Sequence, residues 1–191
     1  MNARERIIES AKELFSQKGY SNTSVEEIVR YAGLSKGAFY FYFKSKDQLM
    51  EGLVNSMAER TKEIMLRWLN KEISSEEAIR GHIRDFLVEC YEDRRIAYVF
   101  FFELMCSKES FRKLHQKHME DIRGLLFQMV KRGYERKEFR CGKAETLVNL
   151  IVGYVRLVYM EKLLLGHAGL EEVLKEAEEG LELIFRGLKC D

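Results

Sequence analysis

One short segment of the chain, SKGAFYFYFKSK, combines residue types that can contact nucleic acid. Lys36 can donate hydrogen bonds to the O6 and N7 atoms of guanine, Gly37 permits a close approach of the backbone, and Ala38 can touch a thymine methyl group. The hydroxyl groups of Tyr40 and Tyr42 can donate hydrogen bonds to phosphate oxygens. These residue types at this spacing suit a helix whose N-terminal end enters the major groove of DNA.

The five consecutive aromatic residues in this segment leave its secondary structure open at first. Alternation of Phe and Tyr from Phe39 to Phe43 is typical of a β-strand. A helix is the better interpretation, because no other strand is predicted and an unpaired strand cannot satisfy its backbone polar groups. In a helix, Phe39 and Phe43 share a face and reach a small core, while Lys36, Tyr40 and Lys44 lie on the other side.

A helix-turn-helix motif is predicted around this segment. Residues 3–18 carry apolar side chains at helical spacing, which indicates a bracing helix. Ser24 and Glu27 have the spacing of a capping box, which begins a second short helix, and Gly33 ends it. The aromatic segment is the third helix, and two short helices joined by a tight turn form the motif. Helix N-termini that carry a hydroxyl group or a lysine bind phosphate, so we expect phosphate contacts at the starts of the second and fourth helices, from Thr23, Ser24 and Lys46.

The rest of the sequence predicts an all-α protein. Beyond residue 46 the apolar periodicity indicates amphipathic helices, and no segment has the pattern of a strand–helix–strand unit. The expected helices cover approximately residues 46–70, 74–95, 96–105, 107–136, 143–166 and 170–188. We therefore expect about nine helices in two domains, a DNA-binding domain in residues 1–46 and a helical bundle in residues 47–191.

The segment TSVEEIVRYAGLSKGAFYFYFKSKDQLM closely resembles the DNA-binding signature of the tetracycline-repressor (TetR) family of transcriptional regulators. The AGLSKG turn, the YFYF run and the following SK pair coincide with that signature in order and spacing, over roughly residues 7–50. Val29 stands where family members often carry Ala, and Tyr42 stands where many carry His. By position, the resemblance implies base reading by Lys36, Gly37, Ala38 and Tyr40, and phosphate contacts by Thr23, Ser24, Tyr40, Tyr42 and Lys46.

The resemblance also implies a homodimer that reads a palindromic operator in double-stranded DNA. The C-terminal domain would bind a small-molecule effector and dimerise, and the effector would release a repressor from DNA. Large apolar residues are frequent in this domain and buried countercharges are not evident, so we expect a lipophilic effector. The expected pocket lining is Phe86, Cys90, Phe102, Met105, Met119 and Tyr154. The alternative is that these side chains only form the packed core.

The last two helices are expected to form the dimer interface. The helix over residues 143–166 is apolar on more than one face, so it needs one partner in its own chain and another in a second chain. The expected four-helix interface contains Leu147, Ile151, Val155, Val158, Leu181, Ile184, Phe185 and Leu188. The alternative is that both helices bury these residues against their own chain.

Composition argues against several other kinds of protein. The net charge is only +1 and the four cysteines form no CxxC pair, so reduced thiols are expected rather than a zinc ribbon or a redox dithiol. His115 and His118 are three residues apart, but their charged neighbours indicate an exposed face and no metal site. No signal peptide is evident and the apolar stretches are too short to cross a membrane, so a cytoplasmic protein without a membrane partner is expected.

Enzymatic function is not indicated by any residue pattern. The sequence shows no activated nucleophile, phosphate-binding loop, paired catalytic carboxylates or metal-ligand spacing, so neither catalysis nor a cofactor is expected. The remaining rival is a helical carrier of small molecules or lipids whose N-terminal three-helix unit is purely structural. Salt-sensitive binding to duplex DNA distinguishes a regulator from such a carrier.

Overall fold

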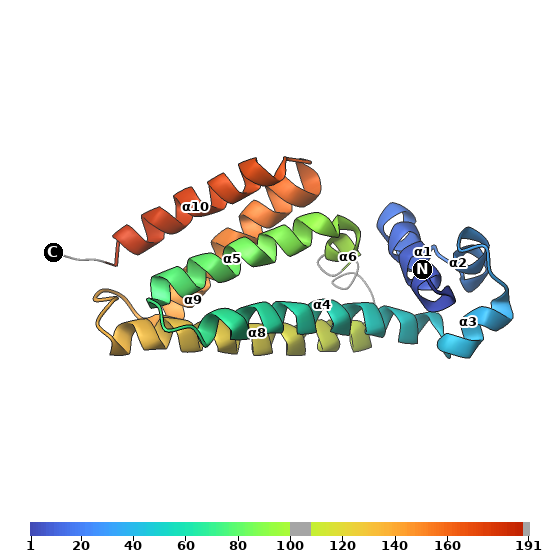
Figure 1. Ribbon diagram of the computed structural model, residues 1–191, viewed down its shortest axis with the longest axis horizontal. Helices are drawn as coiled ribbons and strands as arrows, with labels where there is room; N and C mark the ends of the chain where they lie inside the picture. Colours follow the sequence, from blue (N-terminus) through green and yellow to red (C-terminus); the bar gives the residue numbers. More distant parts are fainter. Residues whose placement is uncertain (100–107, 189–191) are drawn as a thin grey trace. The chain divides into compact units, whose positions relative to one another are not determined.

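The computed structural model describes residues 1–99 and 108–188, and every regular element in them is helical (Figure 1). The α-helices are α1 (Ala3–Lys18), α2 (Val25–Tyr31), α3 (Lys36–Tyr42), α4 (Lys46–Leu69), α5 (Ser75–Glu92), α6 (Arg94–Tyr98), α8 (Glu109–Glu135), α9 (Ala144–Val158) and α10 (Leu170–Arg186). A π-helix, η2 (Tyr159–Leu165), follows α9 directly. The all-α prediction is confirmed, and the aromatic run forms the helix α3.

Two compact units divide the chain. The first contains Met1–Glu59 and Asp93–His118, and the second contains Arg60–Glu92 and the chain from Met119 onward. The first unit therefore combines α1 to α3 with the first part of α4, with α6 and with the start of α8. This grouping reflects contacts rather than activity, so the functional boundary at residue 46 stays a prediction.

The core of the first unit lies between α1 and the two short helices that follow it. Ile7, Ala11 and Phe15 of α1 are fully buried, and α1 contacts α2, α3 and α6. Phe39 is fully buried and its ring centroid lies 5.7 Å from that of Phe43, as the helical interpretation predicted. These two rings fix α3 against the core through one face only, so its opposite face remains exposed.

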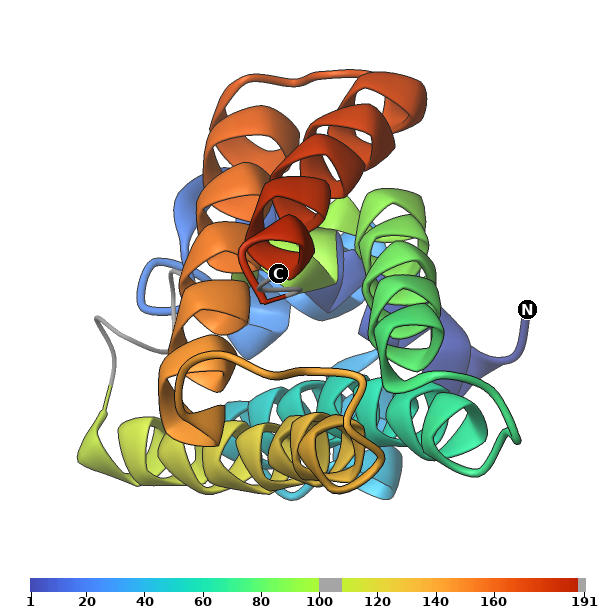
Figure 2. The same cartoon turned by 90° about the vertical axis from the view of Figure 1, so that its left-hand side faces the viewer.

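In the second unit, α10 packs beside α9 and α5 (Figure 2). The ring of Tyr154 on α9 lies so close to Gly180 on α10 that a Cβ atom there would be 2.0 Å from it. The hydroxyl group of Tyr154 donates a 2.5 Å hydrogen bond to the carbonyl oxygen of Glu176. Tyr154, expected to line an effector pocket, is therefore engaged in the contact between α9 and α10.

Most residues predicted for the dimer interface face the interior of their own chain, which is the alternative that the sequence left open. Most of them are buried within their own chain: Leu147, Ile151, Val155, Val158, Leu181, Phe185 and Leu188; Ile184 is half-buried. The exposed apolar side chains of the same helices are Leu150, Leu157 and Leu183, with exposed fractions of 54%, 51% and 72%. Because α9 is apolar on two sides, sequence periodicity alone could not tell which side packs against its own chain.

Two further expectations are also corrected. Cys141 is disulfide-bonded, whereas all four cysteines were expected to be reduced. His118 is buried rather than exposed, and its Nε2 atom lies 2.7 Å from Oδ1 of Asn55 on α4. No helix in the described part of the chain is long and apolar enough to cross a membrane.

Candidate nucleic-acid interface

A tight turn at Gly33 sets the angle between α2 and α3. Gly33 has a φ of +63°, and its N–H donates to the carbonyl oxygen of Arg30 at 3.1 Å. The N–H of Leu34 donates to the carbonyl oxygen of Val29 at 2.8 Å, which completes a Schellman motif. A Cβ atom at position 33 would lie 2.9 Å from Nη2 of Arg6 on α1. The positive φ therefore favours glycine here, and a side chain would also displace the end of the Arg6 side chain.

The helix α3 presents its polar side chains away from the core. Its first turn is capped by Ser35, whose Oγ accepts a 3.2 Å hydrogen bond from the N–H of Ala38. Lys36, Tyr40 and Tyr42 are exposed, and neither tyrosine hydroxyl has a hydrogen-bond partner among the described residues. The polar side chains predicted to face outward from α3 are therefore exposed, and two phenolic hydroxyl groups are available to donate hydrogen bonds to a ligand.

Gly37 lies on this exposed face, and nothing within the described chain requires it. A Cβ atom there would lie 3.7 Å from Oγ of Ser35, which is ordinary van der Waals contact. Glycine inside a helix costs about 1 kcal/mol relative to alanine. A glycine that the fold does not need is compatible with close approach of an external surface, such as base edges in a groove.

An exposed ion pair joins α2 to α3. The ammonium group of Lys36 contacts the carboxylate of Glu26. This contact lowers the pKa of Glu26, chiefly through the hydrogen bond from Lys36, and it raises the pKa of Lys36. Because both side chains are more than half exposed, the pair contributes little to stability. Lys36 can therefore exchange Glu26 for another acceptor at small cost.

The structure contradicts a phosphate role for the Thr23 side chain. Thr23 is 1% exposed, its hydroxyl group donates to the carbonyl oxygen of Gly19 at 2.8 Å, and its N–H donates to that of Tyr20 at 3.2 Å. Thr23 thus closes the loop between α1 and α2. Ser24 is exposed and forms the predicted capping box, accepting from the N–H of Glu27 at 3.2 Å.

Lys46 fixes this loop from the start of α4. Its ammonium group donates to the carbonyl oxygens of Tyr20 and Thr23, each at 2.7 Å, and lies 4.1 Å from the centroid of the Tyr20 ring. Burial lowers the pKa of Lys46. Two of its three N–H groups are used inside the protein, so one remains for a phosphate oxygen.

Tyr20 joins three segments of the first unit. Its buried hydroxyl group donates to the carboxylate of Asp47 on α4, which also accepts from Nζ of Lys108 at 2.7 and 2.9 Å. The ring contacts Phe15 of α1 and Phe111 of α8 edge-on, with both centroid separations 5.4 Å. Burial raises the pKa of Tyr20, and the hydrogen bond from Lys108 is the main reason that the pKa of Asp47 is lowered.

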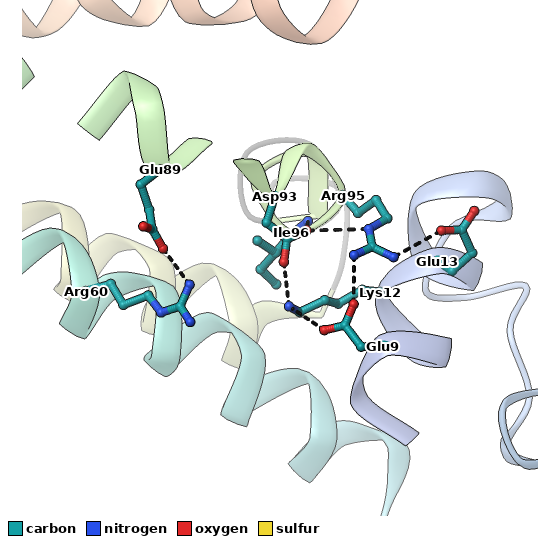
Figure 3. Close-up of polar contacts among 8 residues, drawn as sticks. All are labelled: Glu9, Lys12, Glu13, Arg60, Glu89, Asp93, Arg95 and Ile96. Atoms are coloured by element: carbon teal, nitrogen blue, oxygen red, sulfur yellow. Dashed lines mark hydrogen bonds and ion pairs between the residues drawn. The ribbon is translucent and has the colours of Figure 1, made fainter. Parts of the chain in front are cut away.

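A cluster of ion pairs ties α1 to α6 (Figure 3). Lys12 of α1 contacts Asp93, the N-cap residue of α6, and its Nζ lies 2.9 Å from Oε1 of Glu9. Arg95 of α6 donates to Glu9 at 2.7 Å and to Glu13 at 3.3 Å. Lys12 and Asp93 are largely buried, so this cluster is less screened by solvent than the pair on α3.

Sequence reasoning missed two exposed aromatic residues of this region. Phe41 on α3 is 81% exposed and its ring packs edge-on against Tyr42, with centroids 4.9 Å apart. Tyr31 at the end of α2 is 59% exposed. Helical spacing could have identified Phe41, because it lies one turn after Gly37 and away from the buried face.

The described residues among those predicted to line an effector pocket come from α5, α8 and α9. Phe86 and Cys90 lie one turn apart on α5, while Met119 is half-buried on α8. Phe102 and Met105 lie outside the described residues. His82, one turn before Phe86, is buried beside it, with ring centroids 6.3 Å apart. Sequence analysis did not assign it a role, although it shares the helical spacing.

One pocket in the second unit is charged rather than apolar. It has a volume of about 730 Å³ and is lined by Arg60, Glu63, Ile64, Arg67, Asp85, Val88, Glu89 and Glu92. Arg60 pairs with Glu89 (Figure 3), and Nη2 of Arg67 lies 3.6 Å from Asp85. This lining does not suit the lipophilic effector that the sequence predicted. No group of three potential metal-ligating side chains occurs among the residues that the structure describes.

Known proteins of similar sequence and structure are transcriptional regulators. A regulator of the TerR/AcrR family from Aquifex aeolicus VF5 is 35% identical, and the alignment covers 96% of this chain and 99% of that chain with a TM-score of 0.82. IcaR, the negative regulator of the biofilm operon icaADBC in Staphylococcus aureus, is 25% identical over 83% of each chain. YuxN of Bacillus subtilis, an HTH-type transcriptional regulator, is 51% identical over 55 residues, which are 29% of this chain and 19% of YuxN.

The fold also matches that of FadR from Bacillus subtilis, solved in complex with stearoyl-CoA, with a TM-score of 0.79 over 96% of this chain and 98% of that chain at 20% identity. At the level of sequence families, residues 7–53 match the bacterial regulatory proteins of the tetR family. Residues 77–184 match the tetracyclin repressor-like C-terminal domain. The helix-turn-helix geometry and both family matches agree, so the chain belongs to the TetR family of transcriptional regulators.

Proposed function

We propose that this regulator binds double-stranded operator DNA as a homodimer, represses transcription, and is released by a small, largely apolar effector. The observation that carries the DNA-binding part is that buried apolar and exposed polar side chains lie on opposite faces of α3. Phe39 and Phe43 fill the core, whereas Lys36, Tyr40 and Tyr42 point outward, and the only ion pair of Lys36 among the described residues is the exposed one with Glu26. Repression is supported by the similarity to IcaR, a negative regulator.

In this proposal, the first turn of α3 contacts base edges, and later residues of α3 contact the phosphate backbone of the DNA. Base contacts come from Lys36, Gly37, Ala38 and Tyr40. Phosphate contacts come from Ser24, Tyr40, Tyr42 and the remaining N–H of Lys46. Thr23 is left out because its hydroxyl group is buried. The DNA-binding domain then corresponds to residues 1–46, and effector binding and dimerisation belong to residues 47–191.

The proposed dimer contact uses the exposed rather than the buried side of α9 and α10. Leu150 and Leu157 lie seven residues apart on one side of α9, and Leu183 is exposed on α10. Pairing these faces across a two-fold axis removes three large apolar side chains from water. A two-fold dimer presents two copies of α3, which explains why the operator would be a palindrome.

An effector pocket in the helical domain is supported by the fold shared with FadR, which was solved with stearoyl-CoA. In this proposal the effector favours a conformation of residues 47–191 in which the two copies of α3 no longer match the operator. Such coupling between two sites is typically worth about 1–3 kcal/mol. Phe86 and Cys90 remain candidate lining residues, since both belong to one face of α5.

The experiment is a titration of duplex DNA with the full-length protein at several salt concentrations, using genomic fragments and scrambled controls. We expect affinity that falls with rising salt and that exceeds the affinity for scrambled DNA. Lys36→Ala should reduce the preference for the cognate sequence. The matched control Lys131→Ala removes an exposed lysine that also pairs with a carboxylate, Glu135 on α8, and should change neither quantity. Salt-independent or absent binding would favour the carrier function instead.

A further inference from the structure

A stripe along one face of α5 combines a buried imidazole, a half-buried aromatic ring and a buried thiol. His82, Phe86 and Cys90 follow one another at intervals of one helical turn, so they share a face of α5. The ring of Phe86 lies 6.3 Å from that of His82 and 6.1 Å from that of Tyr159, measured between centroids. Tyr159 is the first residue of the π-helix η2. An imidazole, a thiol and a phenol therefore gather where α5 faces η2.

The Nδ1 atom of His82 is buried and has no hydrogen-bond partner among the residues that the structure describes. The residue is only 6% exposed, so water does not reach this atom in bulk. An unsatisfied buried polar atom is costly, and native structures contain few of them. A ligand that hydrogen-bonds to Nδ1 would remove this cost, whereas the protein without ligand carries it.

The backbone that begins at Tyr159, beside the ring of Phe86, is also irregular. Residues Tyr159–Leu165 form a π-helix, and the N–H of Gly166 closes it on the carbonyl oxygen of Glu161 at 2.7 Å. π-Helical turns are rare, and those that do occur are frequently found at functional sites. The irregular turn and the unsatisfied atom occur on facing elements and are independent observations.

The titratable groups of this stripe are all uncharged near neutral pH, which favours an uncharged ligand group. Burial lowers the pKa of His82 to about 4, so its ring is neutral near neutral pH. Burial raises the pKa values of Cys90 and Tyr159, so both of them also stay neutral. Asp85 is the nearby charge that acts on His82, and its carboxylate accepts a 2.8 Å hydrogen bond from Nε1 of Trp68. Nη2 of Arg67 lies 3.6 Å from the same carboxylate, so both charges are already engaged with each other, and an anionic group beside the three neutral groups would lack a countercharge among them.

We infer that His82 is the hydrogen-bonding anchor of the effector site, and that its ligand is an uncharged, largely apolar molecule carrying a hydroxyl or carbonyl group. This inference rests on the proposed function, which supplies the effector, and adds the chemistry that recognises it. A neutral imidazole offers one donor and one acceptor, so Nδ1 can serve a hydroxyl group in either direction. Phe86 packs against the apolar part of the molecule.

The test uses full-length protein and three probes of equal chain length, namely decanol, methyl decanoate and decanoate. Binding is measured by calorimetry and by the rise in unfolding temperature. The variants are His82→Leu, which keeps an apolar shape, and His82→Asn, whose amide places a polar atom near the position of Nδ1. Binding of duplex DNA is measured separately for each variant without a probe.

We expect decanol and methyl decanoate to bind the native protein more tightly than decanoate. His82→Leu should weaken decanol binding by about tenfold and raise the unfolding temperature of the free protein, whereas His82→Asn should restore much of the binding. Equal binding of decanoate, no binding of either neutral probe, or unchanged decanol binding by His82→Leu would overturn the inference. If the native protein did not bind duplex DNA, the proposed function would be refuted, whereas the assignment of His82 as a ligand-binding residue would still stand on the binding of the probes.

Discussion

At the residue scale, Gly37 separates the demands of folding from those of DNA binding. Gly37→Ala should stabilise the protein by up to about 1 kcal/mol, because alanine is the better helix former and the added methyl group would make only ordinary van der Waals contact. The same change should weaken operator binding, because the added methyl group would stand between the backbone and the base edges. Denaturant unfolding and fluorescence anisotropy measure the two effects.

Gly52→Ala is the matched control for Gly37→Ala. Gly52 lies within α4, and a Cβ atom there would meet nothing within 4 Å. This control should gain similar stability and keep full affinity for DNA. If Gly37→Ala bound the operator as well as Gly52→Ala, close approach of α3 to base edges would be disproved.

The titration of His82 is a second prediction at this scale. Its pKa is about 4 in the folded protein against an ordinary 6.5, so the unfolded chain binds more protons between these values. Stability should therefore fall as the pH is lowered through this range, by about 3 kcal/mol in total. His82→Leu has no titratable imidazole at this position, so the unfolding free energy of the variant should fall less over the same pH range. Parallel pH profiles for the two proteins would show that His82 is not buried as a neutral ring.

At the scale of elements, Lys46 holds the loop between α1 and α2 against the start of α4. Lys46→Met keeps the aliphatic stem but removes two hydrogen bonds to backbone carbonyl oxygens. We expect a loss of about 1–2 kcal/mol in unfolding free energy, together with weaker binding to all DNA sequences. Lys44→Met, at an exposed lysine two residues earlier, should leave the unfolding free energy unchanged. Equal stability of the two variants would contradict the positioning role of Lys46.

Helix positions could be predicted because their signals are local. The capping boxes at Ser24 and Ser74 and the turn at Gly33 depend on residues a few positions apart. The outward face of α3 followed from the spacing of Phe39 and Phe43. The π-helix after Val158 was not predicted, since residues 143–166 continue the same apolar pattern without a break.

The contacts between side chains that are distant in the sequence could not be predicted. The Thr23 hydroxyl group turns back to Gly19, and Lys46 uses two N–H groups on a loop more than twenty residues away. Leu147 and Leu150 are equally apolar, yet only Leu147 is buried in its own chain. The partner and the burial of each of these side chains depend on how distant helices pack, and residue type and periodicity do not determine that packing.

At the scale of the whole molecule, dimerisation should depend on the exposed side of α9. The double variant Leu150→Glu with Leu157→Glu places two charges on that side without touching the buried core. We expect a monomer in sedimentation analysis and a large loss of operator affinity, because two linked half-sites bind far more tightly than separate ones. Leu66→Glu, at a half-exposed leucine of α4, is the control and should remain a dimer. A dimeric double variant would place the interface elsewhere.

The central claim is that this TetR-family chain reads an operator with two copies of α3. The most direct measurement is the selection of bound sequences from a pool of random DNA duplexes by the full-length protein at near-physiological salt. The account predicts enrichment of an inverted repeat, with half-site centres about one helical turn apart or somewhat more. It also predicts that Lys36→Ala loses preference at one position of each half-site. A pool without enrichment, or one enriched in single half-sites, would contradict the account.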